Sequence, residues 1–237
     1  MKIPISKRLL CCASMIRPGA RVADVGCDHG YLGIYLLQQG IASYIAAMDL
    51  RPEPLEKARQ NAARFQTADR MSFAVCDGLA AVGKGFVDTV VCAGMGGDTI
   101  SGILDDCTWA KDPEITWILQ PQSSGNDLRR WLGTHEYRIL RETLIRDGGF
   151  LYSVMDVRFG GGTPVSPGRQ YVSEQLLEND SELVREYLER VIRGIRRAVE
   201  GLSRAKTDEE AARRCYYETA LQEVLEMEAA YENRTGN

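Results

Sequence analysis

The stretch Val22-Ala-Asp-Val-Gly-Cys-Asp-His-Gly-Tyr-Leu32 decides the fold, because it joins an apolar strand to a helix through a turn that carries acids and glycines. Residues 22–25 supply the strand, and residues 31–37 are predicted to form the helix. Gly26 and Gly30 let backbone approach a ligand without an intervening Cβ. Asp24 ends the strand beside that ligand. The stretch therefore predicts a binding turn for a nucleotide-like molecule.

The glycine spacing separates two classes of cofactor. A dinucleotide site needs Gly-x-Gly-x-x-Gly at the start of the helix, where bare amides face a pyrophosphate. Here only Gly26 and Gly30 are present, and Asp28 and His29 stand between them. A carboxylate at a helix N-terminus repels a pyrophosphate and suits a cationic or zwitterionic ligand, of which S-adenosylmethionine is one. The pattern thus favours a methyltransferase over a dehydrogenase.

Composition limits what this chain can be. With 237 residues and 44% hydrophobic content, it can bury one α/β core and still carry an extension. The net charge of -4 supplies no global positive field, so an RNA partner needs a local basic patch. Seven cysteines without a Cys-x-x-Cys pair predict neither a disulfide framework nor a metal site. Because there is no apolar run of about 20 residues and no signal peptide, we expect a cytoplasmic protein without a membrane partner.

Strands and helices alternate along the first part of the chain. This alternation forces parallel pairing through right-handed crossovers, which predicts a doubly wound α/β sheet. The first helix is expected to be capped by Ser6 and to pack against the edge of the sheet. The expected strands cover residues 22–25, 44–49, 71–75, 87–93 and 115–120, and the expected helices cover residues 7–16, 31–37, 52–65, 98–106 and 123–132.

Two further strands follow, at residues 137–145 and 150–158, and the short turn between them predicts an antiparallel hairpin. Five parallel strands closed by a hairpin match the seven-stranded sheet of methyltransferases. Glycines and prolines crowd residues 160–168, which we interpret as a boundary. The prediction is a catalytic domain at residues 1–162 and an extension at residues 163–237.

The extension is predicted to be an antiparallel helical hairpin of the coiled-coil type. Asn179 with Glu182, and Thr207 with Glu210, have the spacing that caps the start of a helix. An apolar seam is formed by Val184, Leu188, Val191, Ile195, Ala198 and Leu202. On the opposite side lies a basic stripe made of Arg190, Arg193, Arg196 and Arg197, which is either a solvated face or an RNA contact. Arg129 and Arg130, on the predicted helix at residues 123–132, are further candidates for RNA contact.

Acids follow the second and third strands as well as the first. Asp49 ends the second strand 25 residues after Asp24, where a doubly wound nucleotide site places an acid on the ribose hydroxyls. Asp77 and Gly78 follow the third strand, where adenine would lie. Each could instead be an ordinary turn former. Together they predict a cofactor lying across the carboxyl ends of three strands.

The segment Ala93-Gly-Met-Gly-Gly97 carries three glycines in four positions, which predicts bare backbone near a substrate or near the transferring methyl group. The alternative is a tight strand-to-helix turn. Gln120 either bonds a base edge or is a strand-end amide. His29 either acts as an acid or base or is structural, and Tyr31 either covers the cofactor or fills the interface between helix and sheet.

Three of these motifs together resemble the bacterial tRNA (adenine-N1)-methyltransferase family that modifies adenine 22 of tRNA. They are Asp24-x-Gly26-x-Asp28-His29-x-Tyr31-Leu32, Ala93-Gly-Met-Gly-Gly97 and Leu119-Gln120-Pro121. The match spans nearly the whole chain and includes the Ser6-Lys-Arg-Leu9 start and the Arg129-x-Trp131-Leu132 helix. The resemblance implies a class I S-adenosylmethionine fold, Rossmann-like and seven-stranded, with a C-terminal coiled coil that helps to hold tRNA.

The resemblance also implies roles for individual residues. It assigns the target-base region to Gly94, Met95, Gly96 and Gly97. From their own chemistry, Asp28 and Gln120 are further catalytic candidates. Two departures from the family pattern are Asp49, where a glutamate is expected, and Gln122, where an asparagine is expected. The cofactor contacts expected from the resemblance and the motifs are Asp24, Gly26, Asp28, His29, Tyr31, Asp49, Asp77, Gly78 and Ala93.

The implied chemistry makes modest demands on the protein. Adenine N1 carries an in-plane lone pair, so it attacks a sulfonium methyl group without prior deprotonation, and alignment supplies much of the catalysis. The methylated product is cationic, and a carboxylate such as Asp28 could stabilise the developing charge. Two alternatives remain open: a methyltransferase for another RNA or a small molecule, and a non-catalytic RNA-binding module.

Overall fold

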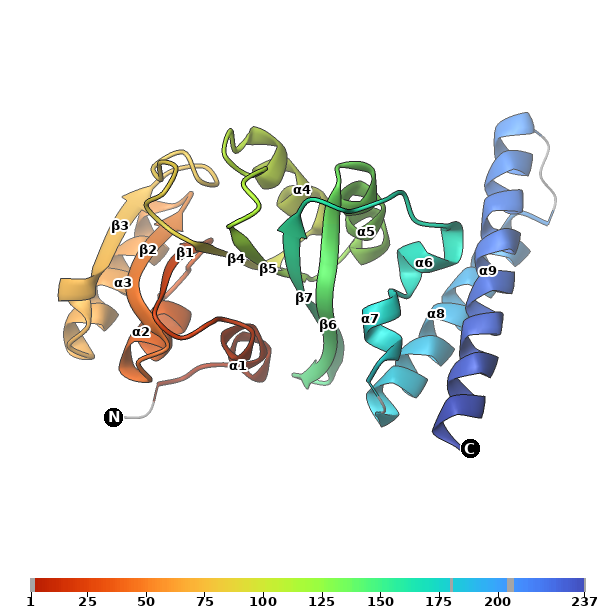
Figure 1. The fold of residues 1–237 in the computed structure, drawn as a ribbon, viewed down its shortest axis with the longest axis horizontal. Coiled ribbons are helices and arrows are strands. Elements are labelled where there is room, and N and C mark those ends of the chain that lie inside the picture. Colours follow the sequence, from red (N-terminus) through yellow and green to blue (C-terminus); the bar gives the residue numbers. More distant parts are fainter. Residues whose placement is uncertain (1–2, 180, 204–206, 237) are drawn as a thin grey trace.

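A computed structural model, which describes residues 3–179, 181–203 and 207–236, arranges the chain as one sheet with helices on both faces and a helical extension beyond one edge (Figure 1). The strands are β1 Ala20–Val25, β2 Ala42–Asp49, β3 Met71–Val75, β4 Thr89–Met95, β5 Thr116–Pro121, β6 Tyr137–Asp147 and β7 Phe150–Phe159. The helices are α1 Lys7–Ser14, α2 Tyr31–Gln38, α3 Pro52–Arg64, the 3-10 turn η1 Ala68–Arg70, α4 Gly97–Asp106, α5 Gly125–Thr134, α6 Pro167–Tyr171, α7 Glu174–Leu177, α8 Glu182–Gly201 and α9 Asp208–Thr235.

The sheet has the strand order β3-β2-β1-β4-β5-β7-β6. Strands β1 to β5 are parallel, whereas β7 pairs antiparallel with both β5 and β6. The predicted seven-stranded sheet with its terminal hairpin is therefore confirmed. Because the strand order reverses between β1 and β4, a ligand crevice is expected at the carboxyl ends of these strands.

Each face of the sheet packs against its own set of helices. Val22, Ile45 and Val91 point into the core that α1, α2 and α3 cover. The opposite face packs against α4 and α5. Helix α1 is capped by the Ser6 side chain as predicted, but it lies on a face of the sheet, against β4 to β7, and not at an edge. Its buried residues are Cys12 and Ala13, and this position brings the N-terminal part of the chain close to the ligand crevice.

The extension forms an antiparallel helix pair beyond β6 (Figure 1). Tyr231 near the end of α9 accepts a hydrogen bond from the backbone N–H of Ser181 at the start of α8, at 3.1 Å. Thr207 forms the predicted capping box with Glu210. The cap of α8 is Ser181 and not Asn179, whose side chain bonds backbone carbonyl groups instead.

The apolar seam of α8 is wider than the heptad pattern indicates. Tyr187 and Ile192 are buried alongside Val184, Leu188 and Ile195, whereas the expected seam residues Val191, Ala198 and Leu202 are only half-buried. The reason is that α8 packs against more than α9: its core cluster includes Leu144 of β6 and Leu151 of β7, together with residues of α7. The short helices α6 and α7 were not predicted.

A buried ion pair links the sheet to the extension. The guanidinium of Arg129 on α5 is paired with the Glu142 carboxylate of β6, and both side chains are almost fully buried. Arg129 also donates to the backbone oxygen of Gln170 at 3.2 Å and to the Tyr187 hydroxyl at 3.4 Å. Arg129 is therefore a structural residue and is not available for RNA, which corrects its place among the candidate contacts. Arg130 is exposed.

The described part of the chain contains no helix that is both long and apolar enough to cross a membrane. Among the same residues, no three histidine, cysteine or acidic side chains gather as they would around a metal ion.

Candidate active site

A cavity of about 530 Å³ opens at the carboxyl ends of β1 to β4, where the strand order reverses. It collects eleven of the predicted site residues, which are Asp24, Gly26, Asp28, His29, Tyr31, Asp49, Asp77, Gly78, Ala93, Gly94 and Met95. The acids follow the order of the strands: Asp24 lies on β1, Asp49 on β2, and Asp77 just after β3. The cavity thus has an acid at three successive points along its length.

Asp24 is a strongly perturbed acid in the cavity wall. Its side chain is buried, and its Oδ2 atom has no hydrogen-bond partner among the described residues. Burial raises the pKa of this carboxyl group from its usual value near 4 to about 7. A buried oxygen without a partner is costly, so its presence in a cavity wall indicates a place where a ligand donor completes the bonding.

The turn after β1 is held by the acid of the neighbouring strand. Asp28 adopts a left-handed backbone conformation (φ 51°), and its N–H donates to Asp49 Oδ2 at 3.1 Å. The other oxygen of Asp49 accepts from the backbone N–H of Arg51 at 3.0 Å. Gly26 also has a positive φ, and a Cβ there would lie 3.1 Å from the Met95 side chain. The turn therefore needs a bare backbone, as a close ligand approach requires.

His29 and Tyr31 form one wall of the cavity, with their rings edge to face at 6.0 Å. His29 Nε2 lies 3.9 Å from Asp28 Oδ2, and its buried Nδ1 has no partner among the described residues. The side chain of Asn61 donates to the backbone oxygen of His29 at 3.0 Å, which fixes this part of the turn. The geometry suits a ligand contact.

The glycine segment after β4 divides into two parts. Gly94, with φ 84°, and Met95 line the cavity. Gly96 and Gly97 lie behind it, against the loop before α5. The N–H of Gly97 donates to the Ser123 oxygen at 2.9 Å, and a Cβ on Gly97 would come within 2.3 Å of the Ser124 oxygen. Close backbone packing, and not ligand access, explains the glycine at position 97.

Gln120 lies behind the glycine segment and does not face the cavity. Its side chain is fully buried, and Oε1 accepts from Arg8 Nη1 at 2.6 Å and from Gly94 N–H at 3.0 Å. Its Nε2 donates to the Pro121 oxygen at 2.9 Å. All of its polar atoms are thus used within the protein. In place of the expected base contact, the structure shows a side chain that holds the Gly94 turn.

Arg8 and Arg51 also line the cavity and were not predicted as site residues. Arg8 comes from α1 and reaches Gln120, 112 positions away in the sequence. No local spacing indicates such a contact; the only signal was the place of Arg8 in the Ser6-Lys-Arg-Leu9 start.

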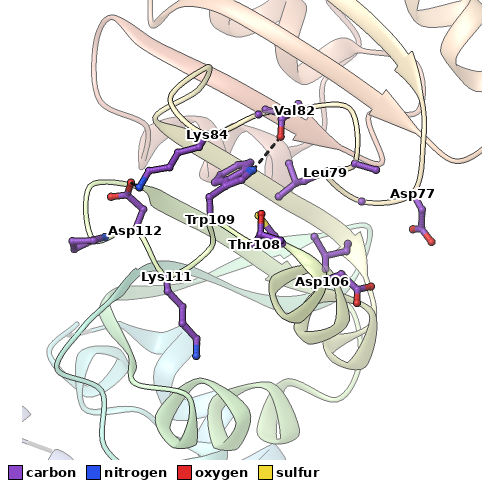
Figure 2. A pocket seen from close by; sticks show the side chains of 15 residues that line it. Asp77, Leu79, Val82, Lys84, Asp106, Thr108, Trp109, Lys111 and Asp112 are labelled. Atoms are coloured by element: carbon purple, nitrogen blue, oxygen red, sulfur yellow. Dashed lines mark hydrogen bonds and ion pairs between the residues drawn. The ribbon is translucent and has the colours of Figure 1, made fainter.

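A second hollow of about 780 Å³ adjoins the cavity and shares the wall made by Asp77, Gly78 and Ile103. Figure 2 shows Trp109 in the middle of the side chains that line this hollow, with Asp77 to one side. Trp109 donates to the Val82 oxygen at 3.0 Å, and this bond joins the loops that follow β3 and α4.

A doubly wound seven-stranded sheet closed by a hairpin, with acids ordered along a crevice at its switch point, defines a class I methyltransferase. A family model described as "Methyltransferase domain" matches residues 5–155. The tRNA (adenine(22)-N(1))-methyltransferase of Bacillus subtilis is 31% identical over 159 residues, which is 67% of each chain. The chain belongs to this family of methyltransferases.

Solved structures extend the likeness to the helical extension. The crystal structure of the B. subtilis m1A22 tRNA methyltransferase is 25% identical, with a TM-score of 0.86, over 96% of this chain and 100% of that chain. A putative tRNA (m1A22) methyltransferase from Streptococcus pneumoniae, solved with S-adenosyl-L-methionine, is 26% identical with a TM-score of 0.80 over 94% and 99%.

Proposed function

We propose that this protein transfers the methyl group of S-adenosylmethionine to N1 of adenine 22 in tRNA. The family supports the reaction and the substrate. The observation that carries the cofactor assignment is the buried, unpartnered oxygen of Asp24 in a cavity that also holds Asp49 and Asp77. We also propose that the protein acts in the cytoplasm, where tRNA is found.

The acids of the cavity fit the parts of this cofactor in order. Asp24 would accept from the ammonium group of the methionine part, Asp49 from the ribose hydroxyls, and Asp77 with the Gly78 backbone would bind the adenine. When bound, S-adenosylmethionine supplies an electrophilic methyl group on a positively charged sulfur. The remaining contacts would come from Gly26, Asp28, His29, Tyr31 and Ala93.

The chain's own part in the reaction is alignment. Gly94 and Met95 would shape the slot for an extruded adenine, and Gln120 would position Gly94 through its hydrogen bond. No general base is required, because adenine N1 is a nucleophile in its neutral form. The exposed carboxylate of Asp28 would stabilise the cationic product. Under saturating cofactor, Asp28→Asn should lower turnover; unchanged turnover would remove this role.

We propose that residues 1–162 form the catalytic domain and that residues 163–237 contribute to tRNA binding. The support is the exposed basic face of α8, where Arg193, Arg196 and Arg197 face solvent. Arg193 pairs with Glu189 at 3.6 Å, whereas Arg196 and Arg197 form no ion pair with another described residue.

The decisive experiment is transfer of tritiated methyl groups to unmodified tRNA transcripts. Label should enter a transcript with adenine at position 22 and should be absent when guanine replaces it. Mapping the label to N1 of that adenine completes the assignment. Equal labelling of both transcripts would refute the target site, and an absence of labelling with bound cofactor would refute the reaction.

A further inference from the structure

Arg8 is a half-buried cation in the wall of an acidic cavity. The other charged side chains in this wall are those of Asp24, Asp28, Asp49, Asp77 and Arg51, together with the titratable His29. Among the described residues, the Arg8 guanidinium forms no ion pair with a carboxylate. It donates a hydrogen bond to the neutral amide oxygen of Gln120, at 2.6 Å. Arg8 thus shares a cavity with several acids but is bonded to a neutral amide, which indicates that its charge is available to a ligand.

Arg8 is held firmly in place. The Tyr152 ring lies 5.8 Å from its Cζ, and its backbone N–H donates to Asp147 Oδ2 at 3.3 Å. The guanidinium also lies directly against Gly94, where a Cβ would come within 2.9 Å of Nη1. Only Nη1 is engaged by Gln120, so Nε and Nη2 keep donors for a ligand.

Arg51, the other arginine in the wall, has a different environment. It is 70% exposed, and its Nε lies 3.9 Å from Asp49 Oδ1. It stands beside β2, in the part of the cavity where the ribose would lie. Arg8 stands at the opposite end, beside Gly94 of β4. The two cations are therefore separated along the cavity and have different partners.

The order of the residues along the cavity indicates which part of the cofactor reaches Arg8. With adenine beside β3 and ribose beside β2, the amino-acid end lies between β1 and β4, where Asp24 and Arg8 stand. That end is a zwitterion with one ammonium and one carboxylate group. We propose that Arg8 binds the carboxylate of the cofactor's amino-acid end while Asp24 binds its ammonium. This inference rests on the proposed function.

Calorimetry with two ligands tests this role without turnover. S-adenosylhomocysteine carries the carboxylate, and its decarboxylated analogue lacks it. The wild-type protein should bind the first about 10- to 100-fold more tightly, the usual range for a charge-assisted hydrogen bond. Arg8→Met should remove most of this ratio by weakening S-adenosylhomocysteine alone, and binding of the decarboxylated analogue should stay within about twofold.

Two further variants complete the test. Arg51 lines the same cavity, and Arg51→Met should leave the affinity ratio of the two ligands unchanged. Arg8→Gln is neutral but keeps a donor for Gln120, and it covers the case in which Arg8→Met folds poorly. Its affinity ratio for the two ligands should be reduced as in Arg8→Met. Binding of the decarboxylated analogue shows that the site is folded.

Several results would overturn the inference. Equal weakening of both ligands would make Arg8 only a support for the Gly94 turn. An unchanged ratio with weaker tRNA binding would assign Arg8 to an RNA phosphate. Equal affinity of the wild-type protein for both ligands would refute the Arg8 role while leaving the proposed function intact. Failure of the wild-type protein to bind either ligand would refute the proposed function itself.

Discussion

Asp24 makes the free protein and the liganded protein respond differently to pH. Burial raises the pKa of its carboxyl group to about 7 in the folded chain, whereas the unfolded chain has the ordinary value near 4. Between these values the unfolded chain has lost the proton and the folded chain still holds it. The stability of the cofactor-free protein should therefore fall as pH rises from about 4 to about 7.

Asp24→Asn should remove this part of the pH dependence. At pH 8 it should stabilise the cofactor-free protein by up to about 4 kcal/mol, because about three pKa units separate the folded and unfolded states. At pH 5 the gain should be small. The same variant should bind S-adenosylhomocysteine at least about tenfold more weakly at pH 8, since the ammonium group loses its anionic partner. Urea unfolding at both pH values and calorimetry measure the two effects; parallel stability curves for variant and wild type would contradict the prediction.

Gly97 tests whether the glycine segment is required for packing. Gly97→Ala places a methyl group against the Ser124 carbonyl oxygen, and it should destabilise the protein by about 1–3 kcal/mol. Gly102→Ala is the matched control on the same helix, where a Cβ meets nothing within 4 Å. That control should stabilise by about 0.5–1 kcal/mol. Thermal unfolding distinguishes the two, and equal shifts would show that the loop before α5 yields to the added methyl group.

Among the elements, α5 and β6 depend on their buried ion pair. Glu142→Gln leaves the Arg129 guanidinium buried without its counter-charge, and it should cost about 3–5 kcal/mol. Replacing both residues by methionine should recover much of that loss. The control is Arg214→Gln, which breaks the exposed pair with Glu218 on α9 and should cost less than about 1 kcal/mol. Urea unfolding of the four proteins checks the order, and a loss below 1 kcal/mol for Glu142→Gln would contradict it.

Elements governed by local patterns were predictable from the sequence. The strand at residues 71–75 was predicted with the bounds that the structure has, because an apolar β-prone run stands between clear breaks. Helices α6 and α7 were not, since they have five and four residues and no measurable periodicity. Distant contacts stabilise them: the N–H of Gly168 donates to Glu223 Oε2 at 2.7 Å, from 55 positions away.

The candidate site divides in the same way. The sequence indicated the acids and glycines at strand ends, because parallel strands bring their carboxyl ends to one edge. It could not indicate that Arg8 and Gly94 share the Gln120 oxygen, or that Arg129 is buried under Tyr187. Those contacts depend on which helix covers which part of the sheet, and the spacing of residues in the sequence does not predict this.

At the scale of the whole molecule, the extension and the sheet share a core. Leu144 and Leu151 of the hairpin belong to the same cluster as α8 and α9, and Arg129 bonds both Gln170 and Tyr187. Removing residues 163–237 would expose these leucines and leave the ion pair partly solvated. A truncated chain therefore loses stability as well as any tRNA contact, so surface substitutions are the sharper test of RNA binding.

Arg193→Glu combined with Arg197→Glu reverses two exposed charges of α8 without touching its buried face. The double variant should weaken tRNA binding by about tenfold or more and lower its salt dependence, because fewer counterions are released. Affinity for S-adenosylhomocysteine should stay unchanged. Arg64→Glu, at the exposed end of α3, is the control. Filter binding at several salt concentrations measures the effect, and equal losses for both variants would argue against α8 as a specific contact.

The side-chain oxygen of Gln120 accepts hydrogen bonds from both Arg8 and Gly94, and this contact can form only late in synthesis of the chain. A chain leaving the ribosome carries Arg8 of α1 early, but Gln120 follows 112 positions later. The binding crevice is completed only after β5 has joined the sheet, because Arg8 of α1 lacks its hydrogen-bond partner Gln120 before then. Cofactor in the cell therefore stabilises chains that have passed this step and gives little protection to shorter nascent ones.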